Sequence, residues 1–148
     1  MKTTIIGLLL LATASVNAQE KAQTYQLADA PRYSEETGYG YDLVATPEKG
    51  SKAPFFFSVR VPDGNYQVTV RLGSKKQAGV TTVRGESRRL FIDNLATKKG
   101  QFVDETFIIN KRNPRISEKE SVRIKPREKA KLNWDDKLTL EFNGDAPV

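Results

Sequence analysis

The fold of this chain is decided by residues 53–72, which read Ala-Pro-Phe-Phe-Phe-Ser-Val-Arg-Val-Pro-Asp-Gly-Asn-Tyr-Gln-Val-Thr-Val-Arg-Leu. Apolar side chains take alternate positions on both sides of the Pro-Asp-Gly-Asn segment. A period of two predicts two half-buried β-strands, with Ser58 and Arg60 on the wet face of the first. The segment between them has turn chemistry, because Pro fixes φ and Gly and Asn tolerate positive φ. We therefore expect a β-hairpin in an antiparallel sheet with one buried face.

Further short strands are expected along the chain, separated by loops rich in Gly, Pro and Asn. They cover residues 25–27, 81–83, 88–92, 102–109, 121–125 and 138–142. The Tyr-rich and Gly-rich segment 33–41 predicts a turn beside packed aromatic rings. No segment has helical periodicity. About eight or nine short strands of this kind are typical of an all-β, antiparallel β-sandwich.

The first 18 residues have the features of an export signal. Lys2 is followed by an apolar segment at 5–14 that is too short to span a bilayer, and Ala18 ends a Val-Asn-Ala cleavage sequence. A buried N-terminal strand or helix is the alternative interpretation. We expect cleavage near Ala18, a flexible leader at 19–23 and a sandwich domain over 24–148. The mature protein would then be periplasmic or extracellular, without a membrane span.

Composition restricts the chemistry of this chain of 148 residues, which contains no His and no Cys. A Ser-His-Asp triad, a Cys nucleophile and a zinc–thiolate site are therefore excluded within it. The spacing of Asp135, Asp136 and Asp145 matches no defined calcium loop, so we expect neither a metal nor a cofactor. The net charge of +6 favours polyanionic partners, which for an exported protein are acidic polysaccharides before nucleic acid.

Two groups of charged residues are candidates for ligand or interdomain contact. Alternation over 84–88 places Arg84, Glu86 and Arg88 on one face, with Arg89 beside them. These side chains would contact a sugar acid or a neighbouring domain, or form a structural ion pair. The second group is a basic stripe at every second position of the 121–125 strand and beyond it: Arg123, Lys125, Arg127, Lys129 and Lys131. It would follow an acidic polymer, or be an ordinary solvated face.

The third candidate group consists of aromatic residues, namely Tyr33, Tyr39, Tyr41 and Trp134. An exposed ring offers an apolar face on which the C–H groups of a sugar stack. The alternative is that these rings pack in the core or between domains.

Several motifs occur here in an order that resembles one family. They are Tyr-Ser at 33–34, Gly-Tyr-Gly-Tyr at 38–41, Pro-Asp-Gly-Asn-Tyr at 62–66, Thr-Thr-Val-Arg-Gly-Glu-Ser-Arg-Arg-Leu at 81–90 and Leu-Asn-Trp-Asp-Asp-Lys-Leu at 132–138. Together they resemble the N-terminal β-sandwich domain of bacterial rhamnogalacturonan acetylesterases, which are GDSL/SGNH-type carbohydrate esterases. The resemblance spans residues 24–146 and implies a jelly-roll, galactose-binding-like sandwich.

The resemblance implies a partner domain rather than an activity for this chain. In the family a hydrolase domain opening with a Gly-Asp-Ser block follows the sandwich, whereas here Gly144 and Asp145 are followed by Ala146. We expect a sandwich truncated before its last strand and before that SGNH-type hydrolase domain. Its expected function is that of a non-catalytic module of an exported, pectin-acting acetylesterase, with an acidic pectic glycan as a candidate ligand.

Two other functions stay open. One is a free-standing glycan-binding module for acidic polysaccharide. The other is a basic OB-like barrel that binds nucleic acid, which the export signal disfavours, as does the lack of clustered exposed aromatic residues on strands.

Overall fold

A computed structural model of the protein describes residues 22–43, 54–126 and 134–147. Within these ranges lie one 3-10 helix and seven strands: η1 (Leu27–Asp29), β1 (Tyr39–Asp42), β2 (Phe55–Arg60), β3 (Gly64–Gly73), β4 (Gly79–Gly85), β5 (Arg89–Thr97), β6 (Phe102–Lys111) and β7 (Lys137–Asp145). None of the described segments forms a helix long and apolar enough to cross a membrane. The predicted export signal at 1–18 lies outside the described residues.

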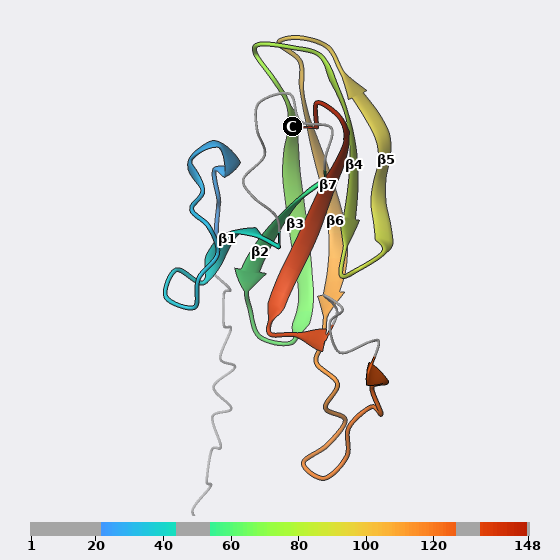
Figure 1. Ribbon diagram of the computed structural model, residues 1–148. Coiled ribbons are helices and arrows are strands. Elements are labelled where there is room, and N and C mark those ends of the chain that lie inside the picture. The colour runs from blue at the N-terminus through green and yellow to red at the C-terminus, as the bar shows by residue number, and fades with distance from the viewer. Residues whose placement is uncertain (1–21, 44–53, 127–133, 148) are drawn as a thin grey trace, which may run out of the picture.

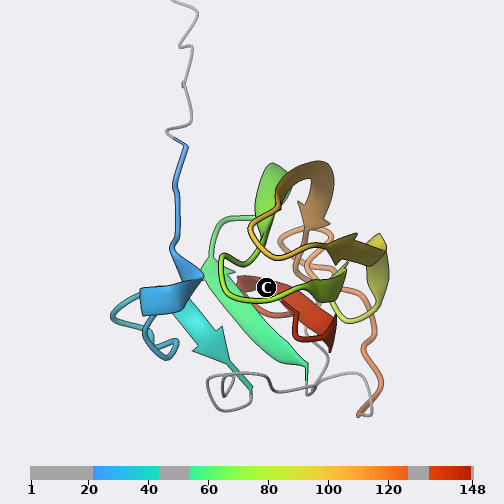
Figure 2. The ribbon, with the colours of Figure 1, turned by 90° about the horizontal axis from the view of Figure 1, so that it is seen from above.

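The strands form two antiparallel sheets that pack against each other (Figures 1 and 2). The larger sheet has five strands in the order β1-β2-β7-β4-β5, and the smaller sheet consists of β3 and β6. The predicted all-β antiparallel sandwich is confirmed. The described residues form seven strands instead of the expected eight or nine.

The predicted hairpin over 53–72 is wrong, although both of its strands are present. β2 pairs with β1 and β7 in the larger sheet, whereas β3 pairs with β6 in the smaller one. The segment at 61–63 therefore carries the chain from one sheet to the other. Alternation fixes which side chains of a strand are buried, but two strands that face one core from opposite layers have the same alternation as a hairpin.

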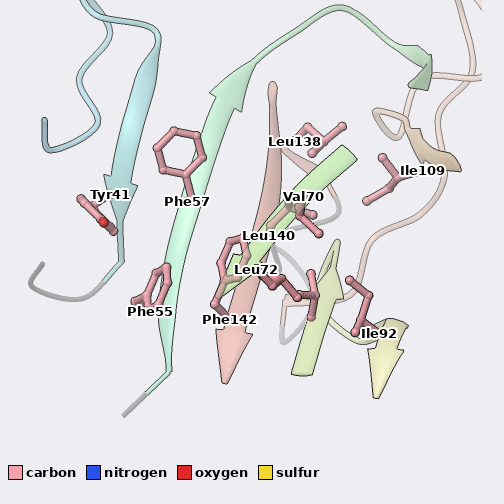
Figure 3. Packing of buried hydrophobic residues seen from close by; sticks show 11 residues of the cluster. Tyr41, Phe55, Phe57, Val70, Leu72, Ile92, Ile109, Leu138, Leu140 and Phe142 are labelled. Atoms are coloured by element: carbon pink, nitrogen blue, oxygen red, sulfur yellow. The ribbon is translucent and has the colours of Figure 1, made fainter. Parts of the chain in front are cut away.

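The core lies between the two sheets (Figure 3). Leu72 of β3, Val83 of β4 and Ile109 of β6 are almost fully buried. Aromatic side chains fill the part of the core next to β1 and β2, and there Phe55 stacks on Phe142 with ring centroids 4.9 Å apart. The buried faces predicted for both strands of the 53–72 stretch are thus confirmed.

Two predicted strands differ from the fold, whereas one predicted turn is confirmed. The 25–27 strand is absent, because Tyr25 and Leu27 pack on the core from a segment that forms η1. The turn expected within 33–41 is present at 35–37, and β1 follows it directly. The 121–125 strand is reduced to an isolated bridge at Ser121. The apolar side chain of Val122 is 40% exposed, so the alternating side chains of this segment have no second sheet to pack against.

Candidate functional site

An open depression of about 470 Å³ lies at one end of the sandwich. It forms where β2 and β6 end and where β3 and β7 begin, which is the lower end in Figure 1. The register explains the convergence, because Arg60 pairs with Lys137 and Gly64 pairs with Lys111. The lining residues are Arg60, Val61, Pro62, Asp63, Lys111, Asn113 and Asp136.

The charges that line the depression are paired with one another. The Lys111 ammonium donates to Asp63 Oδ1 at 2.8 Å, and the Lys111 side chain is only 4% exposed. Arg60 Nε donates to Asp136 Oδ2 at 3.1 Å, and its guanidinium also contacts the Glu35 carboxylate. Each cation is held by a carboxylate, so the depression presents hydrogen-bond donors and acceptors in fixed positions.

Trp134 precedes Asp136, which lines the depression, by two residues. The Arg112 guanidinium lies 5.5 Å from the centre of the Trp134 ring, which is cation–π geometry. In the sequence, Arg112 lies between Lys111 and Asn113, which both line the depression. The indole is half-buried, so part of it stays accessible.

A hydrogen-bonded chain crosses the outer face of the larger sheet from β1 to the turn after β4. Lys137 Nζ and Ser58 Oγ both donate to Asp42 Oδ2, at 2.6 and 2.9 Å. Ser58 Oγ and Thr139 Oγ1 are 2.8 Å apart, and the Thr139 N–H donates to Glu86 Oε1 at 3.0 Å. Ser58 was expected on the wet face of its strand, but it has no exposed surface, and its hydroxyl is satisfied by Asp42 and Thr139.

Asp42, the first carboxylate of this hydrogen-bonded chain, has its protonation state set by its surroundings. Burial alone would raise the pKa of Asp42. The hydrogen bonds from Lys137, Ser58 and a backbone N–H outweigh burial and bring that pKa below its ordinary value. Asp42 is therefore held as an anion that receives the Lys137 ammonium.

Glu86 has the most perturbed pKa among the described residues. Its side chain is buried, and this burial raises the pKa of its carboxyl to about 7, against an opposing hydrogen bond from the Thr139 N–H. The Asp135 carboxylate adds to the increase, and burial raises the pKa of Asp135 as well. Glu86 and Ser87 both have positive φ, at 49° and 74°, which is strained for residues other than Gly.

Arg89 lies close enough to Glu86 to lower the pKa of its carboxyl, but the strand face expected to be shared by Arg84, Glu86 and Arg88 is not formed. β4 ends at Gly85 and the chain reverses over 86–88, so Arg84, Glu86 and Arg88 do not share a strand face. Arg84 instead pairs with Glu141 of β7 at 3.1 Å, and Arg88 is exposed. Arg89 donates to a backbone carbonyl of β6 at 3.1 Å. A structural ion pair exists, but its carboxylate is Glu141.

The candidate tyrosines of β1 belong to the core rather than to a sugar platform. Tyr41 is 7% exposed, and its hydroxyl donates to the Leu27 carbonyl at 2.7 Å. The ring of Tyr39 packs on the ring of Tyr25, with centroids 4.8 Å apart. Tyr33 lies under the Lys137 ammonium, which is 4.7 Å from its ring centre.

The basic stripe is not formed as a strand face within the described residues. Arg123 and Lys125 are exposed on a segment that has only the bridge at Ser121. Arg127, Lys129 and Lys131 lie outside the described residues.

The sequence analysis missed most of the depression and identified only Trp134 beside it. Asp63 and Lys111 are 48 positions apart in the chain, and the β3–β6 register brings them together. One signal was available, because Lys111 has the same parity as Phe107 and Ile109 on a strand whose odd positions were expected to be buried. A lysine at the buried parity of a strand indicates a carboxylate nearby.

In the described part of the chain, no group of three or more acidic side chains could hold a metal ion. Comparisons with protein families, characterised proteins and solved structures give no match to this chain.

Proposed function

We propose that this chain is a non-catalytic β-sandwich module of an exported, pectin-acting acetylesterase, and that it contacts glycan at the depression beside Trp134. The observation that carries the proposal is a partly exposed indole, stacked under Arg112, in the segment that leads into a depression lined by paired charges. An aromatic face and paired donors and acceptors are what a sugar ring requires, since it presents C–H groups on one side and hydroxyls at its edge. The order of the family-like motifs supports the assignment to this class of module.

A non-catalytic role agrees with the chemistry of the site. Ser58 hydrogen-bonds to a carboxylate, but it has no exposed surface through which a substrate could reach its hydroxyl. Without His the chain lacks the commonest general base for activating a serine hydroxyl, and without Cys it lacks a thiolate nucleophile. Saturable hydrolysis of an aryl acetate by the purified chain would contradict this part of the proposal.

The binding test is calorimetric titration of the purified chain with rhamnogalacturonan and oligogalacturonate fragments. Trp134→Ala should weaken binding by about tenfold or more, because it removes the stacking surface. Phe102→Ala is the matched control, since Arg71 lies 5.3 Å from the Phe102 ring at the opposite end of β6. The absence of heat with both fragments, or equal losses in the two variants, would contradict a glycan contact at Trp134.

A free-standing module for acidic polysaccharide is the second candidate function. It is favoured by the net charge of +6 and by the exposure of Arg123 and Lys125. This contact would be mainly electrostatic, so its affinity should fall steeply as salt rises. Binding that depends on Trp134 and changes little with salt favours the first candidate instead.

A further inference from the structure

β3 is an edge strand of the smaller sheet, and none of the described strands pairs with its other side. The smaller sheet has only β3 and β6, and a two-stranded sheet is marginal by itself. β6 has a neighbour on its far side, because β5 approaches it there (Figure 2). Phe91 of β5 stacks on Phe107 of β6 with ring centroids 4.3 Å apart. Among the described strands, β3 forms a hydrogen-bonded ladder with β6 alone.

This edge lacks the features that keep exposed strands from pairing. β3 runs for ten residues in unbroken register with β6, without a bulge. It contains neither Pro nor Lys, and its one charged residue, Arg71, faces Asp104 of β6. Natural edge strands are usually short, bulged or protected by charges, so a long regular edge of this kind is suited to accept another strand.

We infer that β3 pairs antiparallel with β3 of a second copy of this chain, which joins the two small sheets into one four-stranded sheet. A twofold axis at Thr69 places Val68 opposite the second copy's Val70, and Tyr66 opposite its Leu72. Apolar side chains then meet on the inner face. Tyr66 and Val68 are only half-buried in the single chain, and the added strand would cover them.

The outer face is also complementary in this register. Gln67 lies opposite Arg71 of the second copy, and Thr69 lies opposite itself. No two like charges face each other across the axis, although the chain carries a net charge of +6. Cross-strand pairs of this kind stabilise antiparallel sheets, whereas directly opposed like charges destabilise them.

The inference is tested by sedimentation and light scattering of the full chain from micromolar to millimolar concentrations. We expect a concentration-dependent dimer for the natural sequence. Thr69→Lys puts two ammonium groups on the axis and should weaken the dimer by about tenfold or more. Thr106→Lys is the matched control, because it removes the same 2.8 Å contact between Thr69 and Thr106 from the β6 side.

A charge-complementary mixture separates edge pairing from general destabilisation. Thr69→Asp and Thr69→Lys should each be monomeric alone and should form a heterodimer when mixed. Concentration-dependent protection of β3 amides against hydrogen exchange should accompany the dimer. A natural chain that stays monomeric, an equal effect of Thr106→Lys, or a mixture that does not associate would overturn the inference.

Discussion

Replacing the buried carboxyl of Glu86 with a neutral group should remove most of the pH dependence of the free energy of unfolding near neutral pH. Glu86 is 4% exposed, and burial raises the pKa of its carboxyl from 4.5 to about 7. A group that binds its proton more tightly in the folded state stabilises the fold when it is protonated. Stability should therefore fall as pH rises from about 4.5 to about 7, and it should level off above that range.

The size of the effect follows from the change in pKa. Each unit corresponds to about 1.4 kcal/mol, so ionising Glu86 should lower the free energy of unfolding by up to about 3 kcal/mol. Glu86→Gln is neutral at every pH and keeps an oxygen that can accept the Thr139 N–H. We expect this variant to be more stable than the natural chain at pH 8, by about 1–3 kcal/mol, and to be similar to it at pH 5.

Urea denaturation at a series of pH values between 5 and 8.5 measures this difference. Because the chain has no His and no Cys, the titration of Glu86 overlaps with few others in this pH range. The N-terminal amine is the one other group that ordinarily titrates there. Asp135→Asn is an informative second variant. The Asp135 carboxylate raises the pKa of Glu86, so its removal should move the loss of stability to lower pH. Identical slopes in the natural chain and in Glu86→Gln would refute the reasoning.

Two further substitutions test the packing and the buried cation. Gly85→Ala should destabilise the fold by about 1–3 kcal/mol in urea denaturation, because the new Cβ would lie 2.4 Å from Cδ1 of Ile109; unchanged stability would show that the core relaxes there. Asp63→Asn should cost about 2 kcal/mol, since it leaves the buried Lys111 ammonium without its carboxylate. Adding Lys111→Met to Asp63→Asn should recover most of that loss, and a further loss in thermal melting would contradict the assignment.

Alternation along the sequence predicted the strands and their buried faces more reliably than their partners. Phe55 and Leu72 lie on the expected faces of β2 and β3, because burial is decided residue by residue. Pairing depends on which edges other strands occupy. In the larger sheet, β1 and β7 occupy the two edges of β2. β3 therefore does not pair with β2, and it pairs with β6 in the smaller sheet on the other side of the core. No property of residues 53–72 themselves contains that information.

Polar residues show a second limit of reasoning from alternation. Ser58 and Thr139 have the parity of a wet face, yet both are almost fully buried. Their hydroxyls hydrogen-bond to each other, Ser58 also donates to Asp42 of β1, and the Thr139 N–H donates to Glu86 in the turn after β4. Parity gives the direction of a side chain, whereas its exposure depends on what other segments place over it.

The depression shows why the candidate site could not be found as a motif. Its two ion pairs join positions 48 and 76 apart in the sequence, so no local pattern contains either of them. They meet because both sheets have strand termini at the same end, and the buried Lys111 lies close enough to lower the pKa of Glu86 in the neighbouring turn. A charge change at Glu86 near neutral pH is therefore felt by a residue that lines the depression. The charges that line the depression and the buried carboxyl of Glu86 thus belong to one electrostatic network, assembled by topology rather than by sequence proximity.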